Sequence, residues 1–153
     1  MRSSALPLVL IFAAACGEAS RDDAGQIESA GNVDIFTIQV GDCFNDPTSA
    51  SPDIFDVAGV PCHEAHDNQV YALFDIPGDE WPGQEEVEAI AEDGCLARFP
   101  EAIGASYEES VLAYRTLYPS TESWSGANDR EVVCVAYHMN REKLIGSVLG
   151  SGS

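Results

Sequence analysis

The chain has 153 residues, with 26 Asp and Glu against 7 Lys and Arg, so its formal net charge is −19. This excess of acid excludes a nucleic-acid partner, because such binding depends on Lys and Arg that neutralise phosphates, and it excludes docking on anionic lipid through a basic patch. The length suits one domain, and a hydrophobic fraction of 45% is that of a globular protein rather than a disordered chain. The number of cysteines is odd, so one of the five remains unpaired if the other four form two disulfides.

Residues 1–15 have the pattern of an export signal. Arg2 supplies an early positive charge, and the residues from Ala5 to Ala15 are almost wholly apolar. This apolar run is too short for a transmembrane helix, which needs about 20 residues, but it has the length of the hydrophobic region of a signal peptide. We therefore expect residues 1–15 to be a lipoprotein or secretory signal peptide that is removed on export.

Cys16 follows the small residues Ala13, Ala14 and Ala15, and this arrangement resembles a bacterial lipobox. In such a signal the cysteine is acylated, for example with palmitate, and becomes the new N-terminus. The lipobox usually has Leu where Ala13 stands, and the alternative is an ordinary cleaved signal in which Cys16 has no role. Lipidation at Cys16 accounts for the odd cysteine, and it predicts a lipoprotein held by acyl chains at the extracytoplasmic face of the cell membrane.

Residues 16–33 are mostly small, polar or acidic. Such a composition cannot bury a core, so we expect a flexible acidic tether there. The folded domain is then expected over residues 34–150, and residues 151–153 are expected to fray.

The first part of this domain alternates between strand and loop patterns. Residues 34–40 are rich in strand formers, and Asn, Asp, Pro and Ser predict a loop over residues 44–52. Further strands are expected at residues 56–61 and 68–76.

One helix is predicted over residues 84–99, because apolar residues recur there at helical spacing (Val87, Ile90, Ala91, Cys95 and Phe99). Glutamates crowd its first half and complement the positive end of the helix dipole. Pro100 is expected to end or bend this helix.

The last part of the chain predicts strands at residues 111–118 and 131–139, the second with side chains that alternate between two apolar faces. Ser120 is expected to cap a short helix between them. Residues 144–149 are expected to return as a final strand, so that the last two strands form a hairpin. The outline is a small antiparallel sheet with one main helix packed on it, which is an α+β fold.

The four remaining cysteines are expected to form disulfides, since an exported protein meets an oxidising environment. Spacing alone leaves three pairings open. The predicted elements favour Cys43–Cys62, which would close the Pro- and Ser-rich loop, and Cys95–Cys134, which would join the helix to a strand.

Short motifs follow one another along the domain in a recognisable order. They are Val40-Gly41-Asp42-Cys43-Phe44, Val60-Pro61-Cys62, His66, Val70, Trp81-Pro82-Gly83, Gly94-Cys95, Tyr118-Pro119, Ser123-Trp124, Asp129-Arg130 and Val132-Val133-Cys134. Their order and spacing over about residues 40–150 resemble the septum formation domain of actinobacterial exported proteins and lipoproteins.

The resemblance implies a small disulfide-linked domain outside the membrane, with a role at the division site or in the cell envelope. It implies no established activity and no catalytic residues, and it agrees with the cysteine pairing above. Two positions depart from the usual pattern of the family, since Ala65 stands where Pro is usual and Gln69 where Glu is usual. If the loop of the family binds a ligand through that Glu, this chain binds it differently.

His66 is the best polar candidate for a binding role, because Glu64 and Asp67 flank it and would favour its charged form near neutral pH. The alternative is a histidine that hydrogen-bonds the backbone of a disulfide loop. Trp81 and Trp124 could stack on a sugar or a partner protein, or they could anchor the ends of the helices in the core.

Cys62, His63 and His66 raise the alternative of a zinc site, but they lack the paired Cys-x-x-Cys spacing of structural zinc sites. The sequence contains no nucleophile-elbow motif and no phosphate-binding Gly-rich loop. It therefore predicts no catalytic residue, no metal and no cofactor.

Together these features predict a membrane-anchored lipoprotein, a non-catalytic binding or scaffold module of the cell envelope linked to septum formation. Its expected partners are the membrane, through the lipid on Cys16, and an unknown envelope or divisome protein. Two alternatives stay open. One is a cell-wall-associated hydrolase that uses a carboxylate with His66, and the other is a structural lipoprotein whose acids bind cations or solutes.

Overall fold

The computed structural model describes residues 17–47 and 55–153 of the chain. The predicted signal peptide and the predicted lipid on Cys16 concern residues outside these ranges. Within the described ranges, no helix combines the length and the apolar character needed to cross a membrane.

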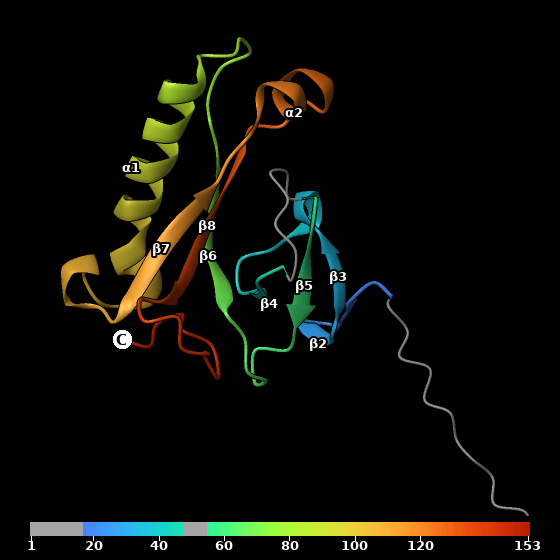
Figure 1. The fold of residues 1–153 in the computed structure, drawn as a ribbon, viewed down its shortest axis with the longest axis vertical. Coiled ribbons are helices and arrows are strands. Elements are labelled where there is room, and N and C mark those ends of the chain that lie inside the picture. The colour runs from blue at the N-terminus through green and yellow to red at the C-terminus, as the bar shows by residue number, and fades with distance from the viewer. Residues whose placement is uncertain (1–16, 48–54) are drawn as a thin grey trace, which may run out of the picture.

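The main sheet of the described chain is antiparallel and has six strands in the order β3-β5-β4-β6-β8-β7 (Figure 1). The strands are β1 (Ser20–Arg21), β2 (Ile27–Ser29), β3 (Gly31–Asp34), β4 (Cys43–Asn45), β5 (Asp56–Val60), β6 (Asn68–Asp75), β7 (Leu112–Leu117) and β8 (Glu131–His138), of which β1 and β2 form a separate small ribbon. The helices are α1 (Gln84–Ile103) and α2 (Thr121–Gly126), with short 3-10 turns η1 (Ile35–Thr37) and η2 (Tyr107–Glu109). The predicted α+β class is confirmed.

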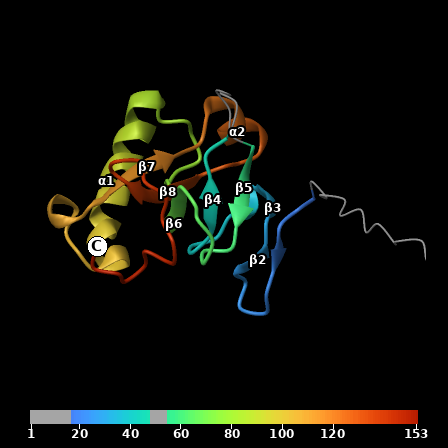
Figure 2. The same ribbon diagram turned by 60° about the horizontal axis from the view of Figure 1, so that its bottom comes forward.

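The central strand β8 is buried on both faces. Its residues Val132, Cys134 and Ala136 lie in a core that contains α1, which we call the helix core. Val133 and Val135, on the opposite face, lie in another core, which we call the sheet core. Figure 2 shows α1 on one side of β6 and β8, and β3, β5 and β4 on the other side. The predicted alternation of this strand is confirmed.

Helix α1 packs through one stripe of buried side chains spaced four residues apart (Val87, Ala91, Cys95, Phe99 and Ile103). The helix is longer than predicted, because Pro100 lies inside it and Gly104 ends it in the left-handed conformation. Pro100 costs the helix one N–H hydrogen bond. The full burial of Ile103 in the next turn favours the longer helix.

Both predicted disulfides are confirmed. Cys43 and Cys62, with Cα atoms 5.2 Å apart, join the start of β4 to the loop that follows β5. Cys95 and Cys134, with Cα atoms 5.4 Å apart, join α1 to the middle of β8 inside the helix core. Each bond restricts the unfolded chain, so each is expected to stabilise the fold by about 3–4 kcal/mol.

The prediction of a flexible tether over residues 16–33 is wrong for its described part, residues 17–33. This segment forms β1, β2 and most of β3, and Ile27 and Val33 are buried in the sheet core. Arg21 donates to both carboxylate oxygens of Asp42, at 2.6 and 2.7 Å, and Asp42 is almost fully buried. The segment is therefore ordered by contacts with the rest of the domain, which its own small, polar composition does not reveal.

The predicted C-terminal hairpin is also wrong. β8 pairs with β6 and β7, and the segment from residue 144 onward contributes only a bridge between Leu144 and His66. β8 already has a neighbour on each edge, so no edge is free for a further strand.

The C-terminal tail runs instead to the end of α1. The backbone N–H groups of Gly150 and Gly152 donate to the carbonyls of Ala102 and Ile103, both at 2.8 Å. The end of a helix leaves such carbonyls without helical partners, so the tail has a physical reason to bind there. Residues 151–153, which were expected to fray, therefore have hydrogen bonds to the domain.

We expect Arg21→Ala to lower the free energy of unfolding by about 3 kcal/mol, because it leaves the carboxylate of Asp42 buried without its partner. Chemical denaturation of the purified protein measures this loss. In the double variant Arg21→Ala/Asp42→Asn the buried charge is gone, so part of the stability should return. An unchanged unfolding free energy for Arg21→Ala would mean that residues 17–33 do not belong to the folded domain.

Candidate functional site

The six-stranded sheet divides into two halves along β6. β4 pairs with β6 only at Cys43–Gln69 and Phe44–Asn68, whereas β6 continues beside β8 as far as Asp75. Because the two neighbours diverge, the sheet has two halves, β3-β5-β4 and β6-β8-β7.

The two halves pack against each other through the sheet core. Phe44 of the first half is buried there with Val133 and Val135 of the second. At the edge of this contact, the guanidinium of Arg115 on β7 lies 2.9 Å from the carboxylate of Asp46, which follows β4. The first half therefore covers the face of β8 that α1 leaves free.

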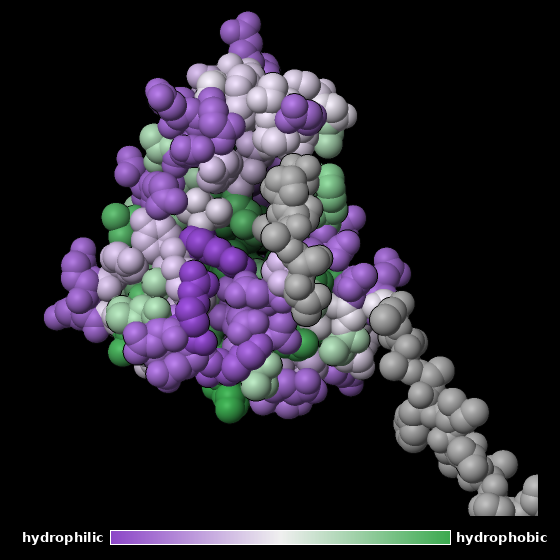
Figure 3. All heavy atoms as spheres, viewed as in Figure 1, coloured by the Kyte–Doolittle hydropathy of each residue, from purple (hydrophilic) through white to green (hydrophobic). Residues whose placement is uncertain are grey.

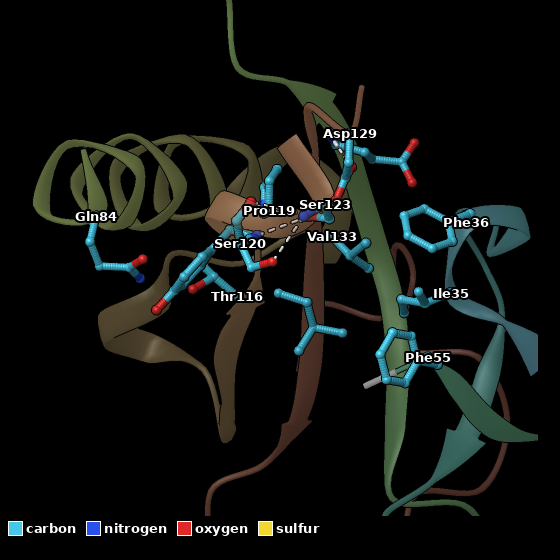
Figure 4. A pocket seen from close by; sticks show the side chains of 13 residues that line it. Ile35, Phe36, Phe55, Gln84, Thr116, Pro119, Ser120, Ser123, Asp129 and Val133 are labelled. Atoms are coloured by element: carbon cyan, nitrogen blue, oxygen red, sulfur yellow. Dashed lines mark hydrogen bonds between the residues drawn. The ribbon is translucent and has the colours of Figure 1, made fainter. Parts of the chain in front are cut away.

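An open cleft of about 410 Å³ lies where the two halves meet near α2. Figure 4 shows the side chains that line it. They are Ile35, Phe36, Phe55, Gln84, Thr116, Leu117, Tyr118, Pro119, Ser120, Ser123, Asp129, Glu131 and Val133. The space-filling view shows a hollow with apolar surface among largely hydrophilic surroundings on this face of the molecule (Figure 3).

One wall of the cleft carries two exposed aromatic rings. Phe36 is 53% exposed and Phe55 is 68% exposed. Asp34 fixes the turn that presents Phe36, since its carboxylate accepts the N–H of Phe36 at 2.8 Å. The carbonyl of Phe55 accepts the N–H of Ile35 at 3.0 Å, which holds the two aromatic residues side by side. Large aromatic side chains that stay exposed beside a cavity are typical of binding surfaces.

The opposite wall is the start of α2, which the predicted cap forms. Ser120 accepts the N–H of Ser123 at 3.1 Å, and the hydroxyl of Ser123 lies 2.9 Å from a carboxylate oxygen of Asp129. The prediction that Ser120 caps a short helix is confirmed. These hydroxyl groups are occupied in holding the wall, so they are not free nucleophiles.

Both tryptophans lie behind this wall. Trp124 is buried, donates its indole N–H to the carbonyl of Asp79 at 3.1 Å, and packs edge-on against Trp81 at 5.4 Å between ring centroids. The guanidinium of Arg130 lies 3.6 Å from the centre of the Trp124 ring. The sequence left two roles open for the tryptophans, stacking on a sugar or partner protein and anchoring the helix ends in the core. These contacts are those of the anchoring role.

Two pairs of acidic residues lie near the cleft, and of these four residues Glu131 is the one that lines it. Asp75 and Glu131 are direct neighbours across β6 and β8, and Asp34 and Asp56 are direct neighbours across β3 and β5. Like charges directly opposite each other in a sheet are destabilising. Burial raises the pKa of Glu131, and the charges of Asp75 and Asp129 raise it further.

The structure places His66 away from the cleft and fully buried. Its Nδ1 lies 2.8 Å from the carbonyl of Glu64, and its backbone forms the bridge with Leu144. Burial lowers the pKa of His66 and outweighs the opposite effects of the Glu64 carbonyl and Asp67. The expectation that the charged form of His66 is favoured near neutral pH is therefore wrong.

The two acids that flank His66 do not form a site around its ring. The side chain of Glu64 is exposed. Asp67 pairs with Lys143 at 2.8 Å and accepts the N–H of Asp46 at 3.0 Å. Burial alone would raise the pKa of Asp67, but these hydrogen bonds lower it below its usual value.

Gln69 is the residue of this loop that the structure makes most important. It is 1% exposed, and its amide nitrogen donates to the carbonyl of Gly41 and to the hydroxyl of Ser147, both at 3.0 Å. Its amide oxygen accepts the N–H of Val148 at 2.7 Å. Where the related pattern has Glu, this Gln binds the C-terminal segment to the disulfide loop, and it is not one of the residues that line the cleft.

No group of three His, Cys, Asp or Glu side chains in the described ranges is placed to hold a metal ion. Cys62 is bonded to Cys43 and offers no thiolate to zinc, which removes the zinc alternative at this loop.

The fold and the cleft define a small α+β domain, held by two disulfides, with an open cleft between two halves of its sheet. The model of the family described as Septum formation matches residues 16–145 of the chain. The match covers most of the sequence, and the protein belongs to this family, which suggests a role linked to septum formation. None of the curated proteins and none of the solved structures compared with the chain matches it.

Sequence reasoning did not identify the cleft. Phe36 falls in a segment that reads as a strand, and Phe55 stands at the edge of the next strand, so both would be assigned to the core. The signal that could have found them is the acidic neighbour of each ring, Asp34 and Asp56, because a strand end rich in acid tends to stay exposed.

We expect Glu131→Gln to stabilise the protein at neutral pH by about 0.2–1 kcal/mol, the usual size of a repulsive cross-strand pair. The pKa of Glu131 is raised in the fold, so the folded state opposes its charged form. The gain should therefore be present at neutral pH and disappear as the pH falls below about 4, where this carboxyl group is neutral in both states. Thermal unfolding at the two pH values measures it. Glu101→Gln, at an exposed position of α1, is the control, and an equal gain there would contradict this account.

We expect Gln69→Glu to destabilise the protein at neutral pH, because a carboxylate cannot donate to the carbonyl of Gly41 and would be buried with its charge. Burial raises the pKa of the introduced carboxyl group, so the folded state favours its protonated form. The deficit in melting temperature relative to the original protein should then shrink as the pH is lowered from about 7 to about 5. A deficit that is independent of pH would show that the introduced carboxyl group is not buried in its charged form, and no deficit at all would show that the donor role of Gln69 is unimportant.

Proposed function

We propose that the protein is a non-catalytic binding module of the cell envelope that serves septum formation. In this proposal a lipid on Cys16 holds it at the outer face of the cytoplasmic membrane, and the cleft between the two halves of the sheet contacts a protein of the division site. Membership of the Septum formation family supports the link to division. The apolar segment and the lipobox-like residues before Cys16 support the anchor.

The single observation that carries the binding role is the pair of exposed rings at the cleft. Phe36 and Phe55 both keep more than half of their surface exposed, beside an open cavity with the apolar residues Leu117 and Val133 in its lining. Holding such rings in water has a cost in free energy that a partner would remove. The rings therefore have the properties of an unoccupied contact surface.

The composition of the cleft supports binding rather than catalysis. None of the described lining residues is a His, Cys, Lys or Arg, and the hydroxyls of Ser120 and Ser123 take part in the helix cap. A nucleophile with a base in hydrogen-bond reach is the minimum for covalent hydrolysis. His66, the base considered from the sequence, is fully buried outside the cleft, so the hydrolase alternative has little support.

The position of the cleft is compatible with an anchor at Cys16. Gly17, the neighbour of that cysteine, already accepts the N–H of Asn32 at 3.0 Å, so the folded domain begins directly after the proposed lipid. β3 leads from this point to Asp34 and η1, at the cleft end of the strand (Figure 1). The anchor and the cleft would thus lie at opposite ends of β3, which leaves the cleft accessible from outside the membrane.

The anchor also fits the charge of the chain. Residues 16–153 carry all 26 acids and every base except Arg2. Such a domain is repelled by anionic lipid, so stable membrane attachment requires covalent acyl chains.

The test is the localisation of the full-length protein, fused to a fluorescent protein, in dividing cells. We expect enrichment at the septum for the original protein and loss of enrichment for Phe36→Asp/Phe55→Asp, because charged side chains would abolish the apolar contact. Ile145→Asp is the matched control, since Ile145 is 76% exposed and lies outside the cleft.

Uniform membrane localisation of the original protein, together with normal septa after deletion of the gene, would contradict the division role. Septal enrichment that survives in Phe36→Asp/Phe55→Asp would contradict the role of the cleft. A protein that stays on the membrane in Cys16→Ala would contradict the lipid anchor.

A further inference from the structure

The chemistry of the cleft selects among the possible partners. Its volume of about 410 Å³ lies at the lower end of the range for ligand pockets, so it has room for a few side chains rather than for a folded domain. The aromatic wall of Phe36 and Phe55 and the residues Leu117 and Val133 favour an apolar group. An extended peptide segment of a partner protein meets both conditions.

The acids beside the cleft lack cationic partners within the described chain. Asp75 and Glu131 are direct neighbours across β6 and β8, and neither carboxylate takes part in an ion pair among the described residues. The two negative charges repel each other across the sheet. A positive charge bound next to them would replace this repulsion by attraction.

Within the described ranges, no basic side chain is left without a carboxylate or aromatic contact to supply that charge. Three of the six bases after Arg2 are paired with carboxylates, and the other three lie over aromatic rings. The carboxylate pairs are Arg21–Asp42, Arg115–Asp46 and Lys143–Asp67, and the ring contacts are Arg98–Phe74, Arg130–Trp124 and Arg141–Tyr137. The cation must therefore come from outside the described chain.

Other occupants fit these observations less well. A second copy of this chain would bring the same excess of acid, and an anionic polymer of the envelope would be repelled in the same way. A metal ion needs several ligands that converge on one point, and no such group occurs in the described ranges.

Resting on the proposed function, we infer that the cleft binds an extended segment of a partner protein in which Lys or Arg alternates with apolar side chains. An apolar side chain enters beside Phe36, Phe55 and Leu117, and a basic side chain next to it pairs with the Glu131 and Asp75 carboxylates. The acidic field of the whole domain speeds the encounter, and the cleft determines where the segment binds.

The test is fluorescence anisotropy with the full-length protein purified in detergent. The probe is a labelled synthetic peptide that alternates lysine with leucine and phenylalanine, and the comparison peptides carry glutamine or glutamate in place of every lysine. We expect the lysine peptide to bind at least about tenfold more tightly than either comparison peptide, with an affinity that falls as salt is added.

A matched set of variants locates the binding. Glu131→Gln/Asp75→Asn removes the two charges of the cross-strand pair at the cleft, and Glu101→Gln/Glu108→Gln removes two charges at exposed positions elsewhere. None of these four side chains accepts a hydrogen bond in the described structure, so all variants should fold. We expect the first variant to weaken binding of the lysine peptide about threefold to tenfold and the second to weaken it less than about twofold.

Three outcomes would overturn the inference. Equal weakening by both variants would mean diffuse attraction without a site. Equal binding of the glutamine peptide, lost in Phe36→Asp, would leave the cleft as an apolar site and leave the proposed function standing. A rise in melting temperature with millimolar calcium that Glu131→Gln/Asp75→Asn abolishes would assign these acids to a metal ion.

Absence of binding by all three peptides would also overturn the inference. The localisation of Phe36→Asp/Phe55→Asp in cells would then decide separately whether the proposed function fails with it.

Discussion

The burial of β8 on both faces is the constraint on which the rest of the structure depends. A strand with apolar side chains on both sides must be covered twice. α1 covers one face and is fixed there by Cys95–Cys134. The β3-β5-β4 half covers the other face through Phe44 and its neighbours. At the end of this second cover, next to α2, the two halves leave the cleft that Leu117 and Val133 help to line.

Segments at the two ends of the described chain, which have little regular structure, pack onto the elements that cover the two faces of β8. The first strands of the chain are tied to the domain by Arg21 and Asp42, and the C-terminal segment is tied by Gln69. A domain of this size has a limited core, so two disulfides and a few buried polar contacts provide a large share of its stability. The same arrangement places Gly17, where the described chain begins, near one end of β3 and the cleft near the other end.

The parts of the fold that could be predicted from the sequence have local or covalent causes. The stripe from Val87 to Phe99, the cap at Ser120 and the pairing of the cysteines all depend on spacing within an element or on the chemistry of sulfur. The segments at the two ends were assigned wrongly because they are ordered by distant partners. Gln69 and Val148 are 79 residues apart, and no pattern within either segment indicates their contact.

The cleft could not be predicted from the sequence, because it too depends on contacts between distant segments. Its aromatic wall comes from residues 35, 36 and 55, and the rest of its lining comes from Gln84 and from residues between 116 and 133. The cleft therefore exists only in the folded protein, where the two halves of the sheet meet. His66 stood out in the sequence because of its acidic neighbours, but burial decides its state, and burial is a property of the assembled fold.

The central claim is that the parted sheet provides a binding surface at the cleft. The most direct measurement is the change in backbone amide NMR signals of the isotope-labelled protein as the lysine-containing peptide is added. The account predicts changes concentrated at residues 35–36, 55, 116–120 and 131–133, around the cleft. Changes centred on the exposed face of α1 or on the C-terminal segment, or no changes at saturating peptide, would contradict it.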